Sequence, residues 1–487
     1  MTSPSLRQPP DGPPRSRGRW ITALACLVLL TEQTALGFTL IAPALTGLAM
    51  EYETTQIIWT ITIFTLIGGV LTPVVGKLGD RFGKRKVLVG AALIALAGSI
   101  LCALAPSFGL FLLGRALMGL STAFLPVTFA LIRDVFPENY RSMSIGIATN
   151  GVGVVTIVGP FLAGFLIDNY STSAVFWFVA VISAVGAAGT LALVPESTVR
   201  NRSRIDVIGV LGLVAGLLLI LYGISQLQTW ELVDVKTLLT VGGGLAILIA
   251  WWMYQARTND PFIDTAVLST RPMATTILTY SFAGGAITVM ASYLPSMLQT
   301  PRLLGMDYGF GLSATGVARY LILAGVLTVV AGIIVGALAP RMGYRPFLII
   351  GPVIIGAGAT GLSAFTTETW MPVLFYGLVG LGSIVYAAGP GMLMVVAPAE
   401  SRGAAAGMMG AISAALGSGF TQLAGLALSK NVGQLVEGYP IYTARGFSQV
   451  FLIAAGMCVV AFLVALFIPK VNSGEIQDRK SQAKETV

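Results

Sequence analysis

One carboxylate in this chain lies deep within a long apolar run. Twenty of the 21 acidic residues fall in loops, in tails or at the ends of apolar runs, whereas Glu32 lies eleven residues into the run 21–44. At 1.5 Å of rise per residue, a helix over this run places Glu32 about 16 Å from its first end. A charge in a hydrocarbon core costs at least about 2.5–3.5 kcal/mol, so such a residue is functional by default. The chemistry that suits it is reversible binding of a proton.

A cation at a similar depth is the natural partner of this acid. Arg115 lies about six residues from the opposite end of the run 109–132, which is about 9 Å of helix. In a core about 30 Å thick the depths of Glu32 and Arg115 differ by about 5 Å, so the two meet if their helices face each other. Burial favours a protonated carboxyl and a nearby guanidinium favours an ionised one, so alternation between these surroundings couples proton binding to a cycle. The alternative is a static ion pair that locks two helices together.

Other polar residues within apolar runs are weaker candidates for a cavity lining. Arg319 is the second cation inside a run, and it contacts backbone carbonyls, contacts an anionic part of a substrate, or extends outward to the membrane interface. The remaining candidates are Gln33, Asn150, Tyr280, Tyr293, Tyr320 and Tyr386. Each is equally compatible with a satisfied contact between helices or an interfacial aromatic.

The composition argues against an enzyme. The chain has no histidine, and its three cysteines, Cys26, Cys102 and Cys458, all lie in apolar runs, so no metal-binding or disulfide pattern is expected. Neither a phosphate-binding loop nor a nucleophile constellation is present. We therefore expect no catalytic residues, no metal and no cofactor, and an ion gradient as the energy source for any work the protein does.

The elements that must position these residues are membrane helices. Only 10% of the 487 residues are charged and 55% are hydrophobic, whereas a soluble domain has about 25% charged residues. Fourteen apolar runs are long enough to span a bilayer. They are 21–44, 55–76, 87–105, 109–132, 142–167, 173–194, 207–227, 237–255, 273–298, 313–338, 347–366, 371–396, 403–428 and 447–469. The sequence predicts an all-α polytopic membrane protein.

The distribution of basic residues predicts the orientation. With the N-terminus inside, 23 Lys and Arg fall in inner segments and four in outer loops, as cytoplasmic loops favour cations. We expect a multi-pass protein of the cell (inner) membrane with both termini cytoplasmic. The net charge of +8 then reflects topology and predicts no nucleic-acid partner.

The most charged cluster, residues 76–86, has a weaker echo at 336–345. Such an internal repeat is typical of transporters whose site lies between two halves. The predicted divisions are a disordered basic tail (1–20), a six-helix bundle (21–200), two linker helices (201–260), a second six-helix bundle (261–470) and a disordered tail (471–487).

The first of these clusters resembles the signature loop of the major facilitator superfamily. The matching residues are Gly76, Leu78, Asp80, Arg81, Gly83, Lys84 and Arg85. Residues 115–119 resemble the family's R-x-x-x-G element. Gly146, Gly159, Pro160 and Gly164 are similar to its antiporter motif, with Val155 where a further glycine is common.

Several further segments resemble the fourteen-helix drug:proton antiporter branch of this family. Glu32-Gln33-Thr34 and Pro43 are similar to its D-x-T…P element, although the acid is Glu and Pro43 lies two residues late. Residues 205–209 and 260–264 also look typical of that branch. The resemblance covers residues from about 20 to 470.

The resemblance implies a fold of two six-helix bundles plus two extra central helices, which act by alternating access. It implies that Glu32 and Arg115 line the first half of a central cavity. It also implies that the signature loop clamps the inner ends of the halves, with Gly76, Asp80, Arg81, Gly83 and Arg85 as gate residues. The candidate partners of Asp80 are the helix start near Gly403 and the side chains of Arg133 and Arg141. A loop that is basic only for orientation is the alternative.

The implied function is proton-coupled export of small lipophilic, cationic or neutral compounds such as drugs, dyes or natural products, which would confer antibiotic resistance. The alternatives are a dedicated exporter or proton-coupled importer of one metabolite, and a non-transporting membrane sensor. The expected partners are a small-molecule substrate, protons and the lipid bilayer, with the protein acting as a monomer.

Overall fold

The computed structural model describes most of the chain as helix. The described residues are 17–200, 206–228, 230, 234–258, 261, 265, 269–301, 308–364, 368–397, 402–436 and 439–469. The helices of the first part are α1 (Arg17–Thr39), α2 (Ile41–Glu51), α3 (Trp59–Phe82), α4 (Lys84–Leu104), α5 (Phe108–Met118), η1 (Gly119–Ala123), α6 (Phe124–Val135), α7 (Glu138–Asn169) and α8 (Thr172–Leu193). The middle of the chain forms α9 (Val207–Ser225), η2 (Gln226–Gln228), α10 (Val235–Thr237), η3 (Leu238–Gly242) and α11 (Gly243–Gln255).

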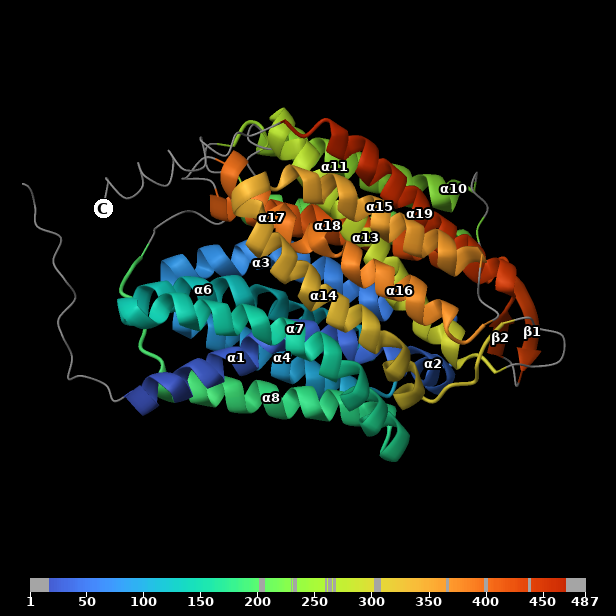
Figure 1. Ribbon diagram of the computed structural model, residues 1–487, viewed down its shortest axis with the longest axis horizontal. Helices are drawn as coiled ribbons and strands as arrows, with labels where there is room; N and C mark the ends of the chain where they lie inside the picture. Colours follow the sequence, from blue (N-terminus) through green and yellow to red (C-terminus); the bar gives the residue numbers. More distant parts are fainter. Residues whose placement is uncertain are drawn as a thin grey trace, which may run out of the picture.

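The last part forms α13 (Arg271–Gln299), α14 (Ala314–Met342), α15 (Arg345–Ala364), α16 (Met371–Gly382), α17 (Ile384–Val396), α18 (Arg402–Ser429) and α19 (Ala444–Leu466). A two-stranded antiparallel hairpin, β1 (Val432–Val436) and β2 (Tyr439–Tyr442), lies between the last two helices. Figure 1 shows the hairpin at one end of the molecule. We name this the hairpin end, and the opposite end, which carries residues 77–86, the basic end.

The described chain contains thirteen helices that are long and apolar enough to cross a membrane. Helix α7, of 32 residues, covers the one predicted run that these thirteen leave out, 142–167. The predicted all-α membrane architecture is confirmed. Helix α1 begins at Arg17, within the predicted tail 1–20, while residues 1–16 and 471–487 lie outside the described part.

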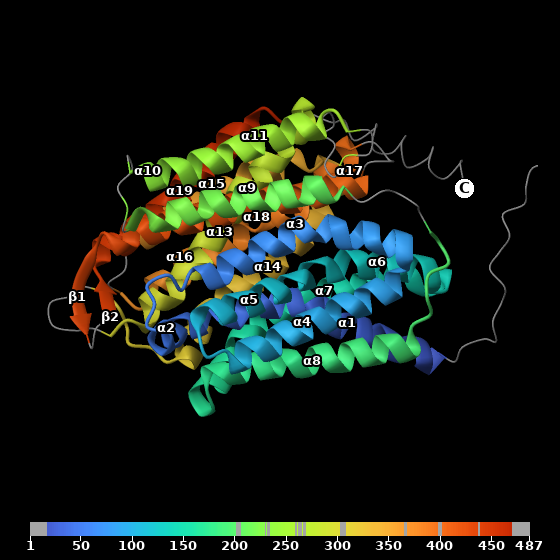
Figure 2. The same cartoon turned by 180° about the vertical axis from the view of Figure 1, so that it is seen from behind.

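The helices pack as two bundles, one from α1 to α8 and one from α13 to α19, which lie against each other (Figure 1). Helices α9 and α11 pack on each other, and α9 also contacts α3 and α18 (Figure 2). Helix α11 exposes large apolar side chains along its length, among them Leu245 and Ile249, as expected of a surface that faces lipid.

Corresponding helices of the two bundles end at residues that are separated by a constant number of positions. The ends of α1, α3, α4 and α7 are Thr39, Phe82, Leu104 and Asn169, and those of α13, α14, α15 and α18 are Gln299, Met342, Ala364 and Ser429. Every pair of residue numbers differs by 260, which is also the spacing of the echo between 76–85 and 336–345. The weak sequence repeat therefore extends over whole bundles in the structure.

Residues at equivalent positions make the same kinds of contact in both bundles. Gly83 and Gly343 follow the ends of α3 and α14 at φ of 116° and 74°, a region that favours glycine. Arg85 Nη1 donates to the Val194 carbonyl beyond α8 at 3.0 Å, and Arg345 Nε donates to the Ile468 carbonyl beyond α19 at 2.7 Å. Each arginine thus satisfies free carbonyls at the end of the last helix of its bundle.

One membrane span in each bundle is interrupted, and the two interruptions are separated by the same number of residues. The fourth span changes from α5 to α6 through η1 and the twelfth changes from α16 to α17 at Ser383. Helix α6 begins at Phe124 and helix α17 at Ile384, again 260 residues apart. Broken helices at corresponding positions of two repeats are the backbone feature that transporters place at their substrate sites.

Candidate functional site

Glu32 is buried without a hydrogen-bond partner. Its side chain is 7% exposed, and neither carboxyl oxygen has a hydrogen bond to any described residue. The hydroxyl of the neighbouring Thr31 donates instead to the Val28 carbonyl at 2.9 Å. An unpaired buried acid is costly, so this site suits a carboxyl that carries a proton in this conformation.

The face of α1 that carries Glu32 lies against α7. Thr39, seven residues later and therefore almost directly above Glu32 on the helix, lies where a Cβ on Gly159 of α7 would be. Gly159 belongs to the predicted antiporter motif. The motif and the candidate proton site thus share one helix interface.

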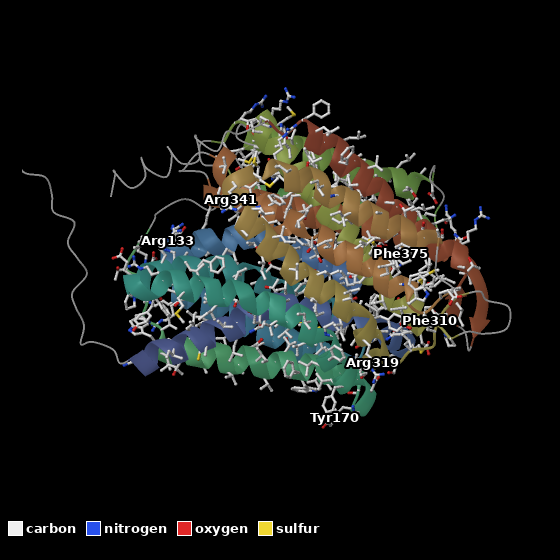
Figure 3. The ribbon with its side chains drawn as sticks, viewed as in Figure 1. Arg133, Tyr170, Phe310, Arg319, Arg341 and Phe375 are labelled. Atoms are coloured by element: carbon white, nitrogen blue, oxygen red, sulfur yellow. The ribbon has the colours of Figure 1, made fainter. Side chains whose placement is uncertain are left out.

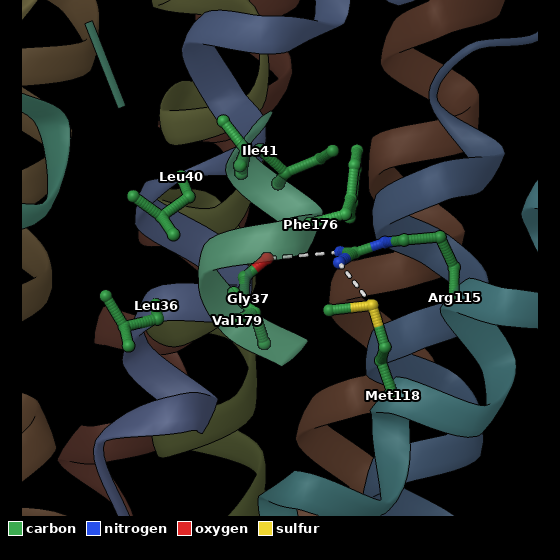
Figure 4. Close-up of a pocket in the computed structure, with 9 residues that line it drawn as sticks. Leu36, Gly37, Leu40, Ile41, Arg115, Met118, Phe176 and Val179 are labelled. Carbon is green, nitrogen blue, oxygen red and sulfur yellow. Dashed lines mark hydrogen bonds between the residues drawn. The ribbon is translucent and has the colours of Figure 1, made fainter. Parts of the chain in front are cut away.

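Arg115 is the most completely buried cation of the described chain, at 1% exposure. Its Nε donates to the Thr60 carbonyl at 3.0 Å. Its Nη2 donates to the Gly37 carbonyl at 3.1 Å, as Figure 4 shows. The guanidinium also lies over the Phe64 ring, 4.5 Å from its centroid. A small pocket beside it is lined by Leu36, Leu40, Ile41, Met118, Val175, Phe176 and Val179.

The predicted meeting of Glu32 and Arg115 does not occur in this conformation. No ion pair joins them among the described residues, and Arg115 is held by backbone carbonyls. The carbonyl that it reaches on α1, that of Gly37, is five residues from Glu32, about 7.5 Å along the helix. The static ion pair is therefore not part of this structure, and Arg115 holds α1, α3 and α5 together through backbone atoms.

The ion pairs of the signature loop lie within the first bundle, whereas Lys77 Nζ donates to the Pro261 carbonyl at 3.2 Å, outside that bundle. Asp80 pairs with Lys84 at 3.2 Å, and Lys84 in turn pairs with Asp134 of α6 at 2.6 Å. Glu196 accepts hydrogen bonds from the backbone N–H groups of Arg85 at 3.0 Å and Lys86 at 3.1 Å, and so caps the start of α4.

The other predicted gate residues make no hydrogen bond or ion pair with the second bundle among the described residues. Arg81 and Arg133 are exposed, and a Cβ at Gly76 would have open space around it. Since Asp80 also pairs within its own bundle, no described contact of these residues clamps the halves at the basic end in this conformation.

The two bundles meet along two seams, α3 with α18 and α7 with α14. Toward the hairpin end these seams are tight. A Cβ on Gly69 would lie 2.5 Å from Ala414 Cβ, and one on Gly164 would lie 2.5 Å from the Thr315 backbone. Gln422 Nε2 also donates to Thr62 Oγ1 at 3.1 Å across the first seam.

Toward the basic end the same seams are open. Added Cβ atoms at Gly76 of α3, Gly146 of α7, and Gly332 and Gly336 of α14 would meet nothing within 4 Å. Figure 1 shows α7 and α14 side by side near the hairpin end and apart at the basic end. The structure is therefore closed at the hairpin end and open at the basic end.

Two side chains fasten the closed end. Asp168, in the last turn of α7, accepts a hydrogen bond from the Thr315 N–H at 3.1 Å in the first turn of α14. Gln299, at the end of α13, accepts from Thr46 Oγ1 at 2.7 Å and donates to the Pro43 carbonyl at 2.9 Å, both on α2. Both contacts join one bundle to the other.

We expect Asp168→Asn to weaken closure at the hairpin end, because an amide is a poorer partner than a carboxylate for the start of a helix. Loss of about 1 kcal/mol, typical of a helix cap, raises the ratio of open to closed hairpin ends about fivefold. Spin labels on the exposed Tyr170 and Trp370, one in each bundle, report this ratio as a distance distribution. Glu53→Gln is the matched control, and an unchanged distribution for Asp168→Asn would contradict the fastening role.

Gly164→Ala has a larger expected effect on the same seam. The new Cβ would lie 2.5 Å from the Thr315 N and Cα atoms, which cannot move without shifting α14. We expect longer distances between the same labels and slower transport. Gly146→Ala, at a position with open space, leaves the closed hairpin end unchanged in the same measurement. If both variants gave the same distance distribution, Gly164 would not be needed for the close approach of α7 and α14.

Between the seams, helices α6 and α17 present exposed faces. On α6 the exposed or half-buried positions Pro126, Phe129 and Arg133 lie on one side, opposite the buried Val127 and Leu131. On α17 the equivalent side carries Tyr386, Pro390 and Met394, of which Tyr386 is 38% and Met394 43% exposed. These faces directly follow the breaks in spans four and twelve.

These faces point toward the opposite bundle rather than toward lipid. Helix α6 lies between α3 and α7, and helix α17 lies between α14 and α18, which are the four helices that form the seams. The buried side of α6 packs on α4, and helix α15 packs on α17. The exposed faces therefore border the space between the two seams, which are open at the basic end.

The predicted cavity residues divide between this space and helix contacts. Tyr386 lies on the exposed face of α17, and its ring packs edge-on against that of Tyr280 at 5.6 Å. Gln33 instead accepts a hydrogen bond from Ser183 of α8 at 2.8 Å, and Tyr293 donates to the Thr421 carbonyl of α18 at 2.8 Å. Gln33 and Tyr293 are thus contacts between helices in this conformation.

Two of the other candidates lie near the hairpin end. Tyr320 packs against Phe310 near the hairpin end, with ring centroids 5.9 Å apart. Arg319 is exposed on α14 near the same end (Figure 3), where an outward-extended side chain is expected. The side chain of Asn150 lies outside those that the structure describes.

Several residues of the site carry no distinct signal in the sequence. Asp134 and Glu196 look like ordinary acids at helix ends, and Asp168 and Gln299 like loop residues. The breaks in spans four and twelve do carry a signal, since Gly119 and Ser121 in one and Gly382 and Ser383 in the other interrupt apolar runs at related positions.

The chain is similar to known membrane transporters in sequence. The family model of the Major Facilitator Superfamily matches residues 27–328 and 276–486. The chain is 28% identical over 433 residues to the tetracenomycin C resistance and export protein of Streptomyces glaucescens, covering 86% of this chain and 78% of that protein. It is 23% identical over 355 residues to multidrug resistance protein 3 of Bacillus subtilis, covering 71% of this chain and 67% of that protein.

Solved structures share the fold at low sequence identity. The human organic anion transporter MFSD10 superimposes with a TM-score of 0.60 at 15% identity, covering 93% of this chain and 100% of that chain. The POT family transporter PepTSo gives a TM-score of 0.64 at 16% identity, covering 93% and 98%. With two repeat-related bundles around a space that opens at one end, and a family match over most of its length, this chain belongs to the major facilitator superfamily.

Proposed function

We propose that this protein is a proton-coupled antiporter that exports small lipophilic compounds, such as drugs, dyes or natural products, from the cytoplasm. Glu32 carries the coupling proton. The observation that supports this most directly is that Glu32 is buried without a hydrogen-bond partner among the described residues, while the buried Arg115 is held by backbone carbonyls. A carboxyl in such surroundings favours its neutral, protonated form.

The orientation follows from charge. The basic end, with residues 77–86, faces the cytoplasm under the rule that cytoplasmic loops carry excess Lys and Arg. In this structure the space between the bundles then opens to the cytoplasm, where it accepts substrate. Reorientation requires release of the contacts of Asp168 and Gln299 at the hairpin end. The signature-loop residues, Asp80 among them, then clamp the basic end shut.

The relatives support export as the direction of transport. Two of them are named for resistance, and one of these is also named as an export protein. The antiporter-like motif lies where Gly159 meets α1 beside the Glu32 face and where Gly164 meets α14. A helix that contacts both the proton site and the opposite bundle is suited to linking protonation to movement.

Transport in proteoliposomes with an imposed pH gradient tests this proposal. We expect dye movement against its own gradient when protons flow the other way, and none without the pH gradient or with a protonophore. An imposed Na⁺ gradient serves as the comparison for the coupling ion. Uptake driven only in the same direction as protons would contradict antiport, and failure of every dye under every gradient would point to a dedicated metabolite carrier or a sensor.

A further inference from the structure

The chemistry of the enclosed space bears on which compounds it accepts. Helix α17 contains no charged residue, and its exposed face offers the Tyr386 ring, Pro390 and the Met394 thioether. The facing side of α6 offers Pro126 and the half-buried Phe129. Aromatic rings and a thioether are favourable contacts for flat apolar molecules.

No described acid lies on these two faces free to compensate a positive ligand. Asp134 of α6 is committed to Lys84 at 2.6 Å and also accepts a hydrogen bond from Ser197. Glu32 is 7% exposed, and Thr39 on the same face of α1 contacts Gly159 of α7. A lipophilic cation would therefore enter this space without a counter-charge, which is costly at low dielectric.

A cation does lie on the same surface. Arg133 is seven residues after Pro126, so the two side chains are on one side of α6, and Arg133 is exposed at the open end. Figure 3 shows Arg133 and Arg341 at the basic end, on different bundles. Arg133 lies on the same side of α6 as the apolar Pro126 and Phe129, whereas Arg341 lies on α14 of the other bundle.

We propose that the site takes planar aromatic compounds that are neutral or anionic, and that it discriminates against lipophilic cations, with Tyr386 as the aromatic contact and Arg133 as the selector of charge. This proposal rests on the proposed export function for its biological meaning. It concerns binding alone, so it can be tested without proton coupling.

Binding of matched dyes to the purified full-length protein in detergent tests the selection. Fluorescein and an esterified, cationic rhodamine share one ring system and differ in charge, and Nile red is a flat neutral probe. We expect fluorescein and Nile red to bind at least about tenfold more tightly than the rhodamine, as measured by fluorescence anisotropy. Equal or tighter binding of the rhodamine overturns the proposal.

Variants separate the two contacts. Arg133→Gln is expected to weaken fluorescein binding about tenfold and to leave Nile red unchanged, while Arg341→Gln, which removes the same charge from the other bundle, has little effect on either. Equal effects of the two substitutions would show that only the general charge of the basic end matters. Tyr386→Ala should weaken all flat probes about fivefold and Tyr386→Phe should not, since the contact is made by the ring.

Transport distinguishes failure of this inference from failure of the proposed function. If the dyes bind in the expected order but none moves under a pH gradient, the export proposal fails and the selection stands. If the rhodamine is both bound and exported in preference to fluorescein, export stands and the selection fails.

Discussion

Glu32→Gln is expected to abolish transport driven by a pH gradient while the protein remains folded in the membrane. Glutamine has nearly the shape of a protonated glutamic acid but cannot release a proton. The side chain is 7% exposed and accepts no hydrogen bond from the described residues, so the amide replaces it without breaking a polar contact. Export in proteoliposomes should fall to the rate of empty liposomes, and exchange of substrate down its own gradient should persist.

The matched control is Glu368→Gln, which removes a negative charge from an exposed position between α15 and α16. It should transport at the rate of the unmodified protein. Proton-driven export by Glu32→Gln at an undiminished rate would exclude Glu32 as the proton carrier. Loss of both driven export and passive exchange would instead indicate that Glu32 is needed for the conformational change itself.

Arg115→Met is expected to lower the free energy of unfolding by about 3 kcal/mol, since hydrogen bonds of charged groups contribute about 1.5–3 kcal/mol each. The substitution leaves the carbonyls of Gly37 and Thr60 without their side-chain donor and removes the cation from the Phe64 ring. The relief of burying one charge less offsets part of this loss. Thermal unfolding in detergent, followed by intrinsic fluorescence, measures the change.

Two further variants show whether the geometry of the guanidinium matters. Arg115→Lys keeps the charge but cannot reach both carbonyls with the same fork of donors, so we expect intermediate stability. Arg319→Met removes a cation at an exposed position of α14 and should change stability by less than about 0.5 kcal/mol. Equal stability of Arg115→Met and the unmodified protein would show that these hydrogen bonds contribute nothing to the bundle.

Membrane architecture could be predicted from the sequence because lipid imposes a simple rule. A chain in hydrocarbon must satisfy its backbone within each span, so length and apolarity alone mark the helices. Each of the fourteen predicted runs overlaps described helices, but their bounds differ. Helix α1 begins at Arg17, and α3 continues to Phe82, so most of the predicted loop 76–86 is helical. The similarity between residues 76–85 and 336–345 likewise predicted an internal repeat, and in the structure this repeat covers both bundles.

Pairing between side chains could not be predicted in the same way. The position of Glu32 and Arg115 along their helices predicts similar depths in the membrane. The side-chain direction around the helix axis decides which neighbouring residue each contacts. In the structure Thr39, on the same face of α1 as Glu32, contacts Gly159 of α7, whereas Arg115 reaches the carbonyls of Gly37 and Thr60. Gln33 and Tyr293, polar residues in apolar runs, proved to bond neighbouring helices for the same reason.

The amino-acid sequence by itself determined the number and order of the spans, the single deep acid, the basic end and the family, because these depend on composition along the chain. Only the tertiary structure decided which end is closed, that Asp168 and Gln299 join the bundles there, and that α6 and α17 present exposed faces on which Tyr386 and Arg133 lie. Those properties depend on contacts between residues far apart in the chain, and in a membrane such contacts are set by close packing of helices rather than by a local pattern.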